Sequence, residues 1–354
     1  MPEVRASTSG VLAEEEPEKE YTNRSQNDRF SVNSTTETGI LKIYYNNCNG
    51  LQPGELLKAN VKEKINKKKK AYVTESIQYT KVRGISGAMK MLDANVMCLS
   101  ETQTAWENNG IREAILKEFR RGDKYTTITG STSNTTSYSV VKPGGTAIIS
   151  DGDWSNKTIK RGQDPSGMGR WSFITIEGKK HSRIMIICGY RCCKGQTINT
   201  VGPLTSYAQQ YYMLKNKGTK KPNPQKQFIK DIKKLITEAM LSSHEILLCL
   251  DANETWQTPN SKIKEMADSL GLIDLVAKKL SPTPPTYTRK GVSNRVDFIL
   301  GSKKVAECLH DVQMEPESLS GNCGDHHGMI IQMHIGPLLN LKEQDLMGPT
   351  SRKL

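Results

Sequence analysis

Long hydrophobic runs are missing from this sequence of 354 residues. No stretch approaches the roughly 20 consecutive apolar residues that a membrane-spanning helix needs. The N-terminus has no apolar signal core, and its acidic run Glu14–Glu16 is atypical of a mitochondrial transit peptide. These absences predict a soluble protein with no membrane span.

Repeated Cys-x-x-Cys pairs are also missing, although the chain has eight cysteines, two of them adjacent at Cys192 and Cys193. Four others lie within or beside apolar runs, where a free cysteine behaves as a small hydrophobic residue: Cys48, Cys98, Cys188 and Cys249. The spacing favours neither disulfides nor structural zinc and predicts a reducing, intracellular setting. The compartment stays open, with the nucleus as one option.

Acidic residues are too few to balance the basic ones, since 37 Asp and Glu face 50 Lys and Arg, for a net charge of +13. Residues 1–40 hold eight acidic and four basic side chains, a net charge of −4, so the remainder carries +17. A body this basic suits a polyanionic partner, and nucleic acid is the commonest. The alternative is that the charge serves solubility alone.

The chain divides by composition into a leader, one domain and a tail, with no internal repeat. Residues 1–38 are rich in Ser, Thr, Asn and Glu, and we expect a disordered acidic leader. Residues 39–336 form the predicted domain, with a lysine-rich insertion at about 53–83 that contains Lys67–Lys70. We expect a solvated helix or loop there; a nuclear-import signal and a phosphate-binding arm are alternatives. Residues 337–354 form a tail without a strong pattern.

Apolar runs between polar flanks predict the strands of this domain, among them 41–47, 95–101, 144–149, 171–176, 183–190, 246–251, 295–300 and 329–335. Residues 110–121 and 228–240 repeat apolar residues with helical spacing. Residues 86–92 suggest a shorter helix, 126–139 a surface loop or weak hairpin, and 161–170 a loop. Because strands and helices do not alternate regularly, we expect an α+β layered fold.

Polar residues recur at the ends of these strands. The run Ile246–Asn253 ends in Asp251 and Asn253, whose side chains point the same way because residues two apart share one face of a strand. The same design recurs at Asn47, Glu101, Tyr190, Asp297, and Asp325 with His326. If the strands pack side by side, these residues converge on one rim.

Such a rim has the chemistry of phosphoryl transfer. Carboxylate and amide oxygens suit a hard cation such as Mg²⁺, with Mn²⁺ as an alternative. A bound cation lowers the pKa of its water and neutralises charge on phosphorus. An imidazole oriented by a carboxylate can donate to phosphate oxygens, and Asp297 is the candidate to orient His326.

Taken in order, these motifs resemble the endonuclease/exonuclease/phosphatase superfamily, which includes exonuclease III, apurinic endonucleases and deoxyribonuclease I. The resemblance extends from about Ile40 to Ile335. It rests on Asn47-Cys-Asn-Gly-Leu, Cys98-Leu-Ser-Glu101-Thr, Gly189-Tyr190-Arg191, Leu250-Asp-Ala-Asn253, Arg295-Val-Asp297-Phe-Ile-Leu and Gly324-Asp-His326. It implies a four-layer α/β/β/α sandwich of two packed mixed sheets flanked by helices, as in deoxyribonuclease I.

The resemblance also implies metal and substrate ligands. Glu101 would bind the metal, with Asn47 and Asp325 as further or water-mediated ligands. The substrate-binding residues would be Arg170, Arg191 and Asn49.

Five residues would carry the catalytic roles that the resemblance implies. Asp251 would align or deprotonate the attacking water, and Asn253 would hold a phosphate oxygen. Tyr190 would support the phosphate or leaving group. His326, oriented by Asp297, would stabilise the pentacovalent transition state.

Among branches of the superfamily, the endonuclease domains of non-LTR retrotransposons look most similar, on the segments 286–291 and 294–297. The implied function is an Mg²⁺-dependent phosphodiesterase that nicks DNA and leaves a 3′-hydroxyl. We expect a monomer with nucleic acid, DNA first, as its partner. A phosphoinositide, sphingomyelin or RNA substrate is an alternative, as is a nucleic-acid-binding remnant without turnover.

Taken singly, each residue also has an ordinary structural interpretation. Tyr190 resembles a core residue, and Asp297 could pair with Arg295 or another basic residue. His326 or His327 could join Cys323 at a zinc site. The order and spacing of the whole set favour the catalytic interpretation.

Overall fold

The computed structural model describes residues 39–51, 71–120, 125–133, 142–194, 205–316 and 324–342, and only the backbone of 71–80. The expected leader, the tetralysine Lys67–Lys70, Cys323 and the last twelve residues lie outside the described residues.

Two six-stranded sheets form the centre of the molecule. The first has the order β13 (Leu309–Met314), β14 (Met329–His334), β1 (Ile40–Asn47), β2 (Val96–Ser100), β4 (Thr146–Ser150), β3 (Thr127–Ser131). The second has the order β5 (Thr158–Gln163), β6 (Trp171–Glu177), β7 (Arg183–Tyr190), β8 (His244–Asp251), β12 (Asp297–Gly301), β9 (Ile273–Asp274). β1 pairs with β2 and β7 with β8 in parallel, while the other pairs are antiparallel, so both sheets are mixed.

The hydrophobic core lies between the sheets. Because side chains alternate along a strand, every second residue faces the opposite sheet, including Ile43, Ile148, Ile186, Cys249 and Ile331. Each is fully buried, and burial of such a side chain stabilises the fold by about 1.5–3 kcal/mol.

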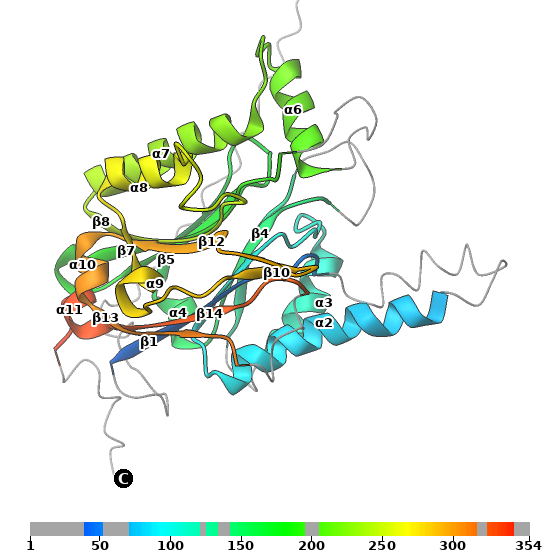
Figure 1. The fold of residues 1–354 in the computed structure, drawn as a ribbon. Coiled ribbons are helices and arrows are strands. Elements are labelled where there is room, and N and C mark those ends of the chain that lie inside the picture. Colours follow the sequence, from blue (N-terminus) through cyan, green and yellow to red (C-terminus); the bar gives the residue numbers. More distant parts are fainter. Residues whose placement is uncertain are drawn as a thin grey trace, which may run out of the picture.

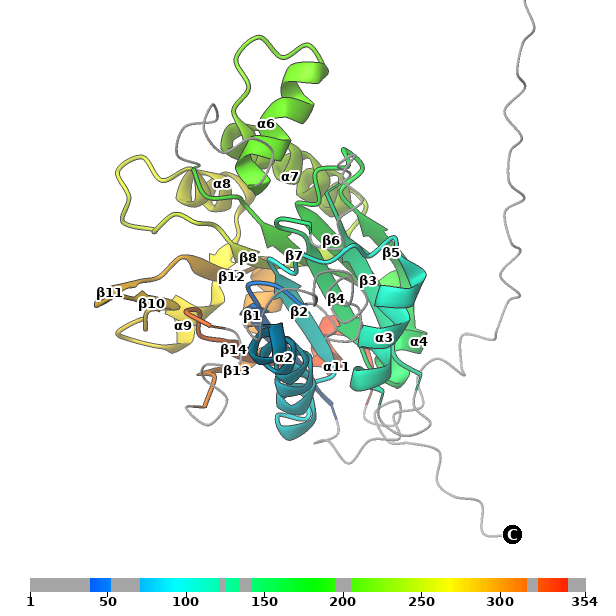
Figure 2. The same ribbon diagram turned by 90° about the vertical axis from the view of Figure 1, so that its right-hand side faces the viewer.

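Helices cover the outer face of each sheet (Figures 1 and 2). α2 (Ala71–Met91) and α3 (Asn109–Phe119) cover the first sheet, and α7 (Pro224–Leu241) and α8 (Lys262–Leu270) cover the second. α7 buries Phe228, Ile232 and Ile236, one stripe of an amphipathic helix. The four-layer α/β/β/α sandwich is therefore confirmed.

Shorter elements complete the described chain: α4 (Asp153–Lys157), the 3₁₀-helix η2 (Lys179–His181), α6 (Ser206–Asn216), α9 (Leu275–Lys279), the hairpin β10 (Tyr287–Arg289) and β11 (Val292–Asn294), α10 (Lys303–Glu307) and α11 (Ile335–Leu339). The core continues past residue 336, because α11 buries Leu338 and Leu339. That short segment has no periodic pattern from which a helix could be predicted.

The expected character of the cysteines is confirmed. Cys48, Cys98, Cys188 and Cys249 are free and buried, and no disulfide joins the cysteines within the described residues. Among the same residues, no helix is both long and apolar enough to cross a bilayer.

Candidate active site

The polar ends of five strands meet at one rim of the sandwich. Within the first sheet, Asn47 at the end of β1 pairs with Ser100 at the end of β2. Within the second, Asp251 at the end of β8 is the register partner of both Tyr190 and Asp297. The convergence predicted from the strand pattern is therefore present.

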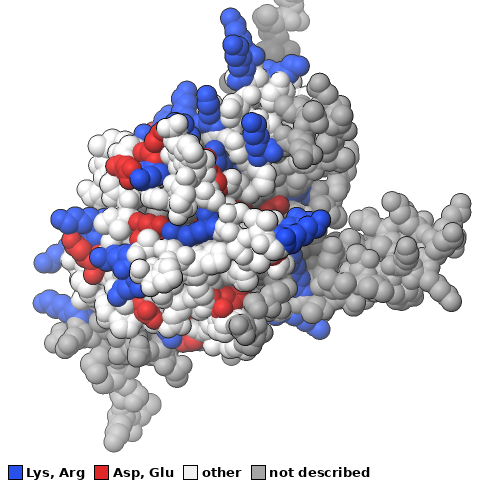
Figure 3. Space-filling model, viewed as in Figure 1, with Lys and Arg blue, Asp and Glu red and all other residues white. Residues whose placement is uncertain are grey.

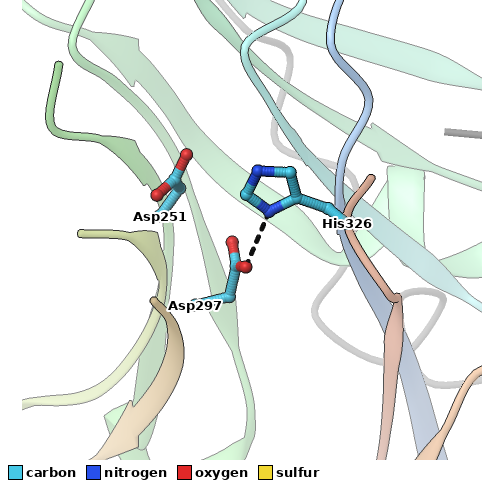
Figure 4. A group of neighbouring side chains, drawn as sticks. All are labelled: Asp251, Asp297 and His326. Carbon is cyan, nitrogen blue, oxygen red and sulfur yellow. Dashed lines mark hydrogen bonds and ion pairs between the residues drawn. The ribbon is translucent and has the colours of Figure 1, made fainter. Parts of the chain in front are cut away.

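Asp297 and His326 form a buried pair across the two sheets (Figure 4). The imidazole Nδ1 lies 2.8 Å from Asp297 Oδ2. The other carboxylate oxygen accepts a 2.8 Å hydrogen bond from the hydroxyl of Tyr45. Both oxygens of Asp297 are thus engaged, which fixes the imidazole with its Nε2 turned toward the centre of the site.

The charge of this pair favours a protonated imidazole. Burial lowers the pKa of His326, but the negative charges of Asp297, Asp251 and Asp325 outweigh it and raise the pKa to about 9. The ring of Tyr287 packs edge-on against His326, with centroids 5.0 Å apart. At neutral pH the histidine is therefore a hydrogen-bond donor.

Asn47 links the remaining groups. Its Nδ2 donates to Glu101 Oε2 at 3.0 Å and to Asp251 Oδ2 at 2.7 Å, and lies 3.4 Å from His326 Nε2. Its Oδ1 accepts from the backbone N–H of Asn49 at 2.8 Å. In this orientation the amide presents N–H groups to the carboxylates, so direct ligation of a cation by Asn47 needs a turned amide.

Asp251 is fully buried and Asn253 follows it in a left-handed backbone conformation with φ of 47°. Asp251 Oδ1 accepts from the backbone N–H of Asn253 at 2.9 Å, which closes a tight turn. The amide of Asn253 donates to the Arg191 carbonyl at 2.9 Å, and its Oδ1 accepts from the Cys193 thiol at 2.7 Å. Asn253 is thus held beside Asp251, at the outer side of the cluster.

Glu101 and Tyr190 complete the cluster on the side of β2 and β7. Glu101 also has a left-handed backbone, with φ of 51°. It accepts hydrogen bonds from Asn47 and from the hydroxyl of the buried Tyr190. Left-handed conformations at non-glycine residues are costly and concentrate at functional sites.

The buried carboxylates repel each other, and this suits a cation. Burial, followed by the charge of Asp297, raises the pKa of Asp251 well above its usual range. Burial likewise raises the pKa of Glu101. One ligand atom each from Asp251, Asp297 and His326 lie within 4.8 Å of one another, so the group could hold a metal ion. Glu101 and Asp251 both accept from the Asn47 amide, and carboxylate oxygens are the ligands that a hard divalent cation prefers.

Arg170 does not lie where the predicted substrate-binding role requires it. Its side chain is only 1% exposed, and its Nε and NH1 donate to Asp164 and Asp231 at 2.6 and 2.8 Å. Its NH2 donates to Asp164 and Ser166. A guanidinium so enclosed cannot line a phosphate site, and its role here is structural.

Arg191 is also turned away from the cluster. Its NH1 donates to the Ala252 carbonyl at 2.8 Å and its NH2 pairs with Glu254 at 3.0 Å. This buried side chain therefore braces the turn that follows Asp251 instead of facing a substrate, contrary to our expectation.

Two other predicted residues lie at the edge of the site. Asp325 pairs with Arg289 of the β10–β11 hairpin at 3.7 Å, and its side chain is 23% exposed. Asn49 is exposed beside Asn47, and its carbonyl accepts from Lys81 Nζ at 2.8 Å. Asn49 is thus accessible to a substrate, whereas Asp325 is shared with the hairpin.

Sequence reasoning missed several residues that support the site. Tyr45 shares the inward face of β1 with Asn47, so strand alternation could have indicated it. Thr286 Oγ1 accepts from the backbone N–H groups of Val296 and Asp297 and fixes the start of β12. Arg295 pairs with Asp274 at 2.6 Å, not with Asp297 as the ordinary interpretation had it.

The fold is similar to those of solved AP endonucleases. The AP endonuclease of Archaeoglobus fulgidus matches with a TM-score of 0.53 and 15% identity, covering 82% of this chain and 98% of its own. LMAP from Leishmania major gives 0.50 and 14%, over 89% and 96%, and the APE2 catalytic domain of Xenopus laevis gives 0.53 and 12%, over 83% and 92%. The chain has the AP-endonuclease fold.

This result confirms the expected fold. At identities of 12–15% the similarity shows the fold alone, so any activity of this chain has to be argued from its own residues. A scan against protein-family models and a search of curated proteins find no match.

Proposed function

We propose that this chain is a metal-dependent phosphodiesterase, an endonuclease that nicks DNA and leaves a 3′-hydroxyl. One observation carries the proposal: Asn47, Asp251, Asp297 and His326, from four separate segments, are joined by contacts of 2.7–3.4 Å. The basic body of the chain favours a polyanionic substrate.

The proposed chemistry follows from the position of each group. Asp251, beside the amide of Asn253, would align the attacking water and accept its proton. The protonated Nε2 of His326 would donate to a phosphate oxygen as negative charge develops there. Tyr190 would support the phosphate or the leaving group. A divalent cation at Glu101 and Asp251, Mg²⁺ first and Mn²⁺ second, would supply charge neutralisation when bound.

A retrotransposon origin is part of the proposal. The segment that resembles non-LTR retrotransposon endonucleases is the segment that frames the site. Thr286 caps the start of β12, and Tyr287 packs on the catalytic imidazole. This resemblance therefore lies in the working part of the molecule.

The decisive experiment is a plasmid-nicking assay. Purified protein is expected to convert supercoiled plasmid to the relaxed form with Mg²⁺ or Mn²⁺ and to stop with EDTA. Asp251→Ala and His326→Ala should each lower the rate by about 10²-fold or more, the usual cost of losing such a group. Matched controls are Asp268→Ala and His181→Ala, which change residues outside the cluster. Nicking that survives both active-site changes would contradict the mechanism.

A substrate panel tests the specificity separately from the chemistry. The same enzyme preparation is assayed on DNA, RNA, a phosphoinositide and sphingomyelin, all of them anionic or phosphodiester substrates that a basic surface tolerates. Turnover of the lipid or RNA alone would reassign the substrate. Salt-dependent DNA binding without turnover of any substrate would identify a binding remnant.

A further inference from the structure

Residues 205–230, called here the α6–α7 arm, have an unusual charge. They contain six lysines and no acidic residue: Lys215, Lys217, Lys220, Lys221, Lys226 and Lys230. All six side chains are exposed. The first lies in the last turn of α6, and the next three lie in the segment 217–223 that joins α6 to α7, at the top of the molecule in Figure 1.

The arm begins at the rim of the candidate active site. Gly144 lies close both to Ser206, the first residue of α6, and to Tyr190 of the site. A Cβ added to Gly144 would lie 2.7 Å from Ser206 Oγ and 3.2 Å from the ring of Tyr190. The first turns of α6 also contact the chain just after Tyr190, where the Cys192 thiol donates to Gln210 Oε1 at 3.5 Å. α6 therefore starts beside the candidate active site and extends outward from it.

One face of α6 presents two tyrosines followed by the first lysine of the arm. Tyr207, Tyr211 and Lys215 are four residues apart and so lie on one side of the helix. Both tyrosines stay partly exposed, and Tyr211 packs edge-on against Tyr212 with centroids 5.8 Å apart. Tyrosine hydroxyls, like lysines, bind phosphate oxygens of the nucleic-acid backbone, so the two tyrosines extend the basic surface toward the site.

Among the described residues, no ion pair with an acidic side chain neutralises the six lysines of the arm. Lys217 donates a 3.1 Å hydrogen bond to the Ser166 carbonyl, which is a neutral acceptor. Figure 3 shows basic side chains projecting at the top of the molecule, with few acidic ones among them. A concentrated positive charge with so little acidic charge around it is available to phosphates.

From this geometry we infer that the α6–α7 arm binds the backbone of the nucleic-acid substrate outside the scissile phosphate. The inference rests on the proposed function and adds a second contact region to it. The 11 residues of α6 span about 16 Å at 1.5 Å per residue. Since a strand of duplex rises about 3.4 Å per phosphate, the lysines would meet the backbone roughly five base pairs from the site.

The test compares two variants with the same reduction in charge. The arm variant replaces Lys215, Lys217, Lys220 and Lys221 with Gln. The control variant replaces Lys278, Lys279, Lys303 and Lys304, on α9 and α10, which lie at the end of the second sheet opposite the site (Figure 1). Binding to a fluorescent duplex of about 30 base pairs is measured in EDTA, without turnover, over a range of salt concentrations.

The arm variant is expected to bind at least about tenfold more weakly at low salt. The slope of log affinity against log salt should fall by about 0.9 for each phosphate that the variant no longer neutralises, while the control keeps the wild-type slope. Equally weakened binding in both variants, or an unchanged slope in the arm variant, would overturn the inference.

Plasmid nicking by the same preparations separates this inference from the proposed function. If wild-type protein binds DNA through the arm but nicks no plasmid, the proposed nuclease activity is refuted and the binding surface stands. Wild-type protein that nicks while the arm variant binds normally refutes the arm and keeps the nuclease.

Discussion

At the scale of single residues, Glu315 connects the loop that contains His326, residues 324–328, to the first sheet. Its backbone N–H donates to the Gly328 carbonyl, and its Oε2 accepts from the Gly328 N–H, both at 2.8 Å. Asn46, the neighbour of Asn47, donates to the same Oε2 at 3.3 Å. Glu315 therefore joins the strand that carries Asn47 to the loop that carries His326, and acts as a positioning residue.

Glu315→Ala is expected to lower kcat by about 10- to 100-fold, the usual cost of removing a group that orients an active-site residue. As a positioning residue that acts through Gly328 and Asn46, Glu315 should affect KM little. Glu315→Gln keeps one oxygen that can accept from the Gly328 N–H and from the Asn46 amide. Its kcat should therefore stay within about threefold of wild type. Steady-state kinetics decide, and a Gln variant as impaired as the Ala variant would refute the positioning role.

A second residue-scale prediction concerns Tyr45, whose hydroxyl donates to Asp297. Tyr45→Phe removes this buried, charge-assisted hydrogen bond, which is worth about 1.5–3 kcal/mol. We expect kcat to fall by about tenfold or more, because Asp297 then holds His326 less firmly. Circular dichroism should show an unchanged fold. Tyr125→Phe, at an exposed tyrosine outside this network, serves as the comparison, and an equal fall in kcat in both variants would contradict the argument.

At the scale of elements, the ion pair of Arg170 with Asp164 holds the turn between β5 and β6. Burial alone would raise the pKa of Asp164, but the hydrogen bonds and charge of Arg170 lower it overall. A carboxylate whose pKa is lowered on folding stabilises the protein above its unfolded pKa of about 3.9, and that contribution is lost as pH falls through the folded value.

Asp164→Asn is therefore expected to lower the free energy of unfolding by about 3 kcal/mol at pH 7, the usual cost of breaking a buried pair. The gap between variant and wild type should narrow below about pH 4, where Asp164 takes up a proton in the unfolded wild-type chain while it stays charged in the folded one. Urea unfolding at several pH values measures both. The exposed Asp268→Asn is the control, and a gap that persists in acid would show that the charge is not the cause.

Elements also show what could be predicted from the sequence. Strongly apolar strands such as β7 and β8 were predicted within two residues, because both faces are buried and the residue type follows burial. β5 was assigned to a loop in part, since its pattern Thr-Ile-Lys-Arg-Gly-Gln is mostly exposed and polar. Arg170 was placed wrongly for a related reason: sequence cannot show that two acids, 6 and 61 residues away, surround it.

At the site, too, contacts between residues far apart in the sequence could not be predicted. The pairing of Asp297 with His326 was predicted, because each follows from a motif. The hydrogen bond from Tyr45 joins residues 252 positions apart and depends on the packing of two sheets. Strand ends could thus be predicted to converge, but not the side chains that brace them.

At the scale of the whole molecule, the rim concentrates charge that the fold has to tolerate. Glu101, Asp251 and Asp297 lie together with little solvent to screen them, and burial raises the pKa of the first two. The unfolded chain scatters these carboxylates, so a divalent cation at the rim would bind the native state selectively. Such a ligand at 100 times its Kd stabilises a protein by about 2.7 kcal/mol.

Adding Mg²⁺ or Mn²⁺ in place of EDTA is therefore expected to raise the melting temperature by about 5 °C, since 1 kcal/mol shifts Tm by about 2–4 °C in domains approaching this size. Glu101→Gln and Asp251→Asn each remove one of the clustered charges and should abolish most of that rise. Asp268→Asn, exposed on α8, should keep it. Differential scanning fluorimetry measures the shift without any substrate, and an identical rise in all four proteins would place the cation elsewhere in the molecule.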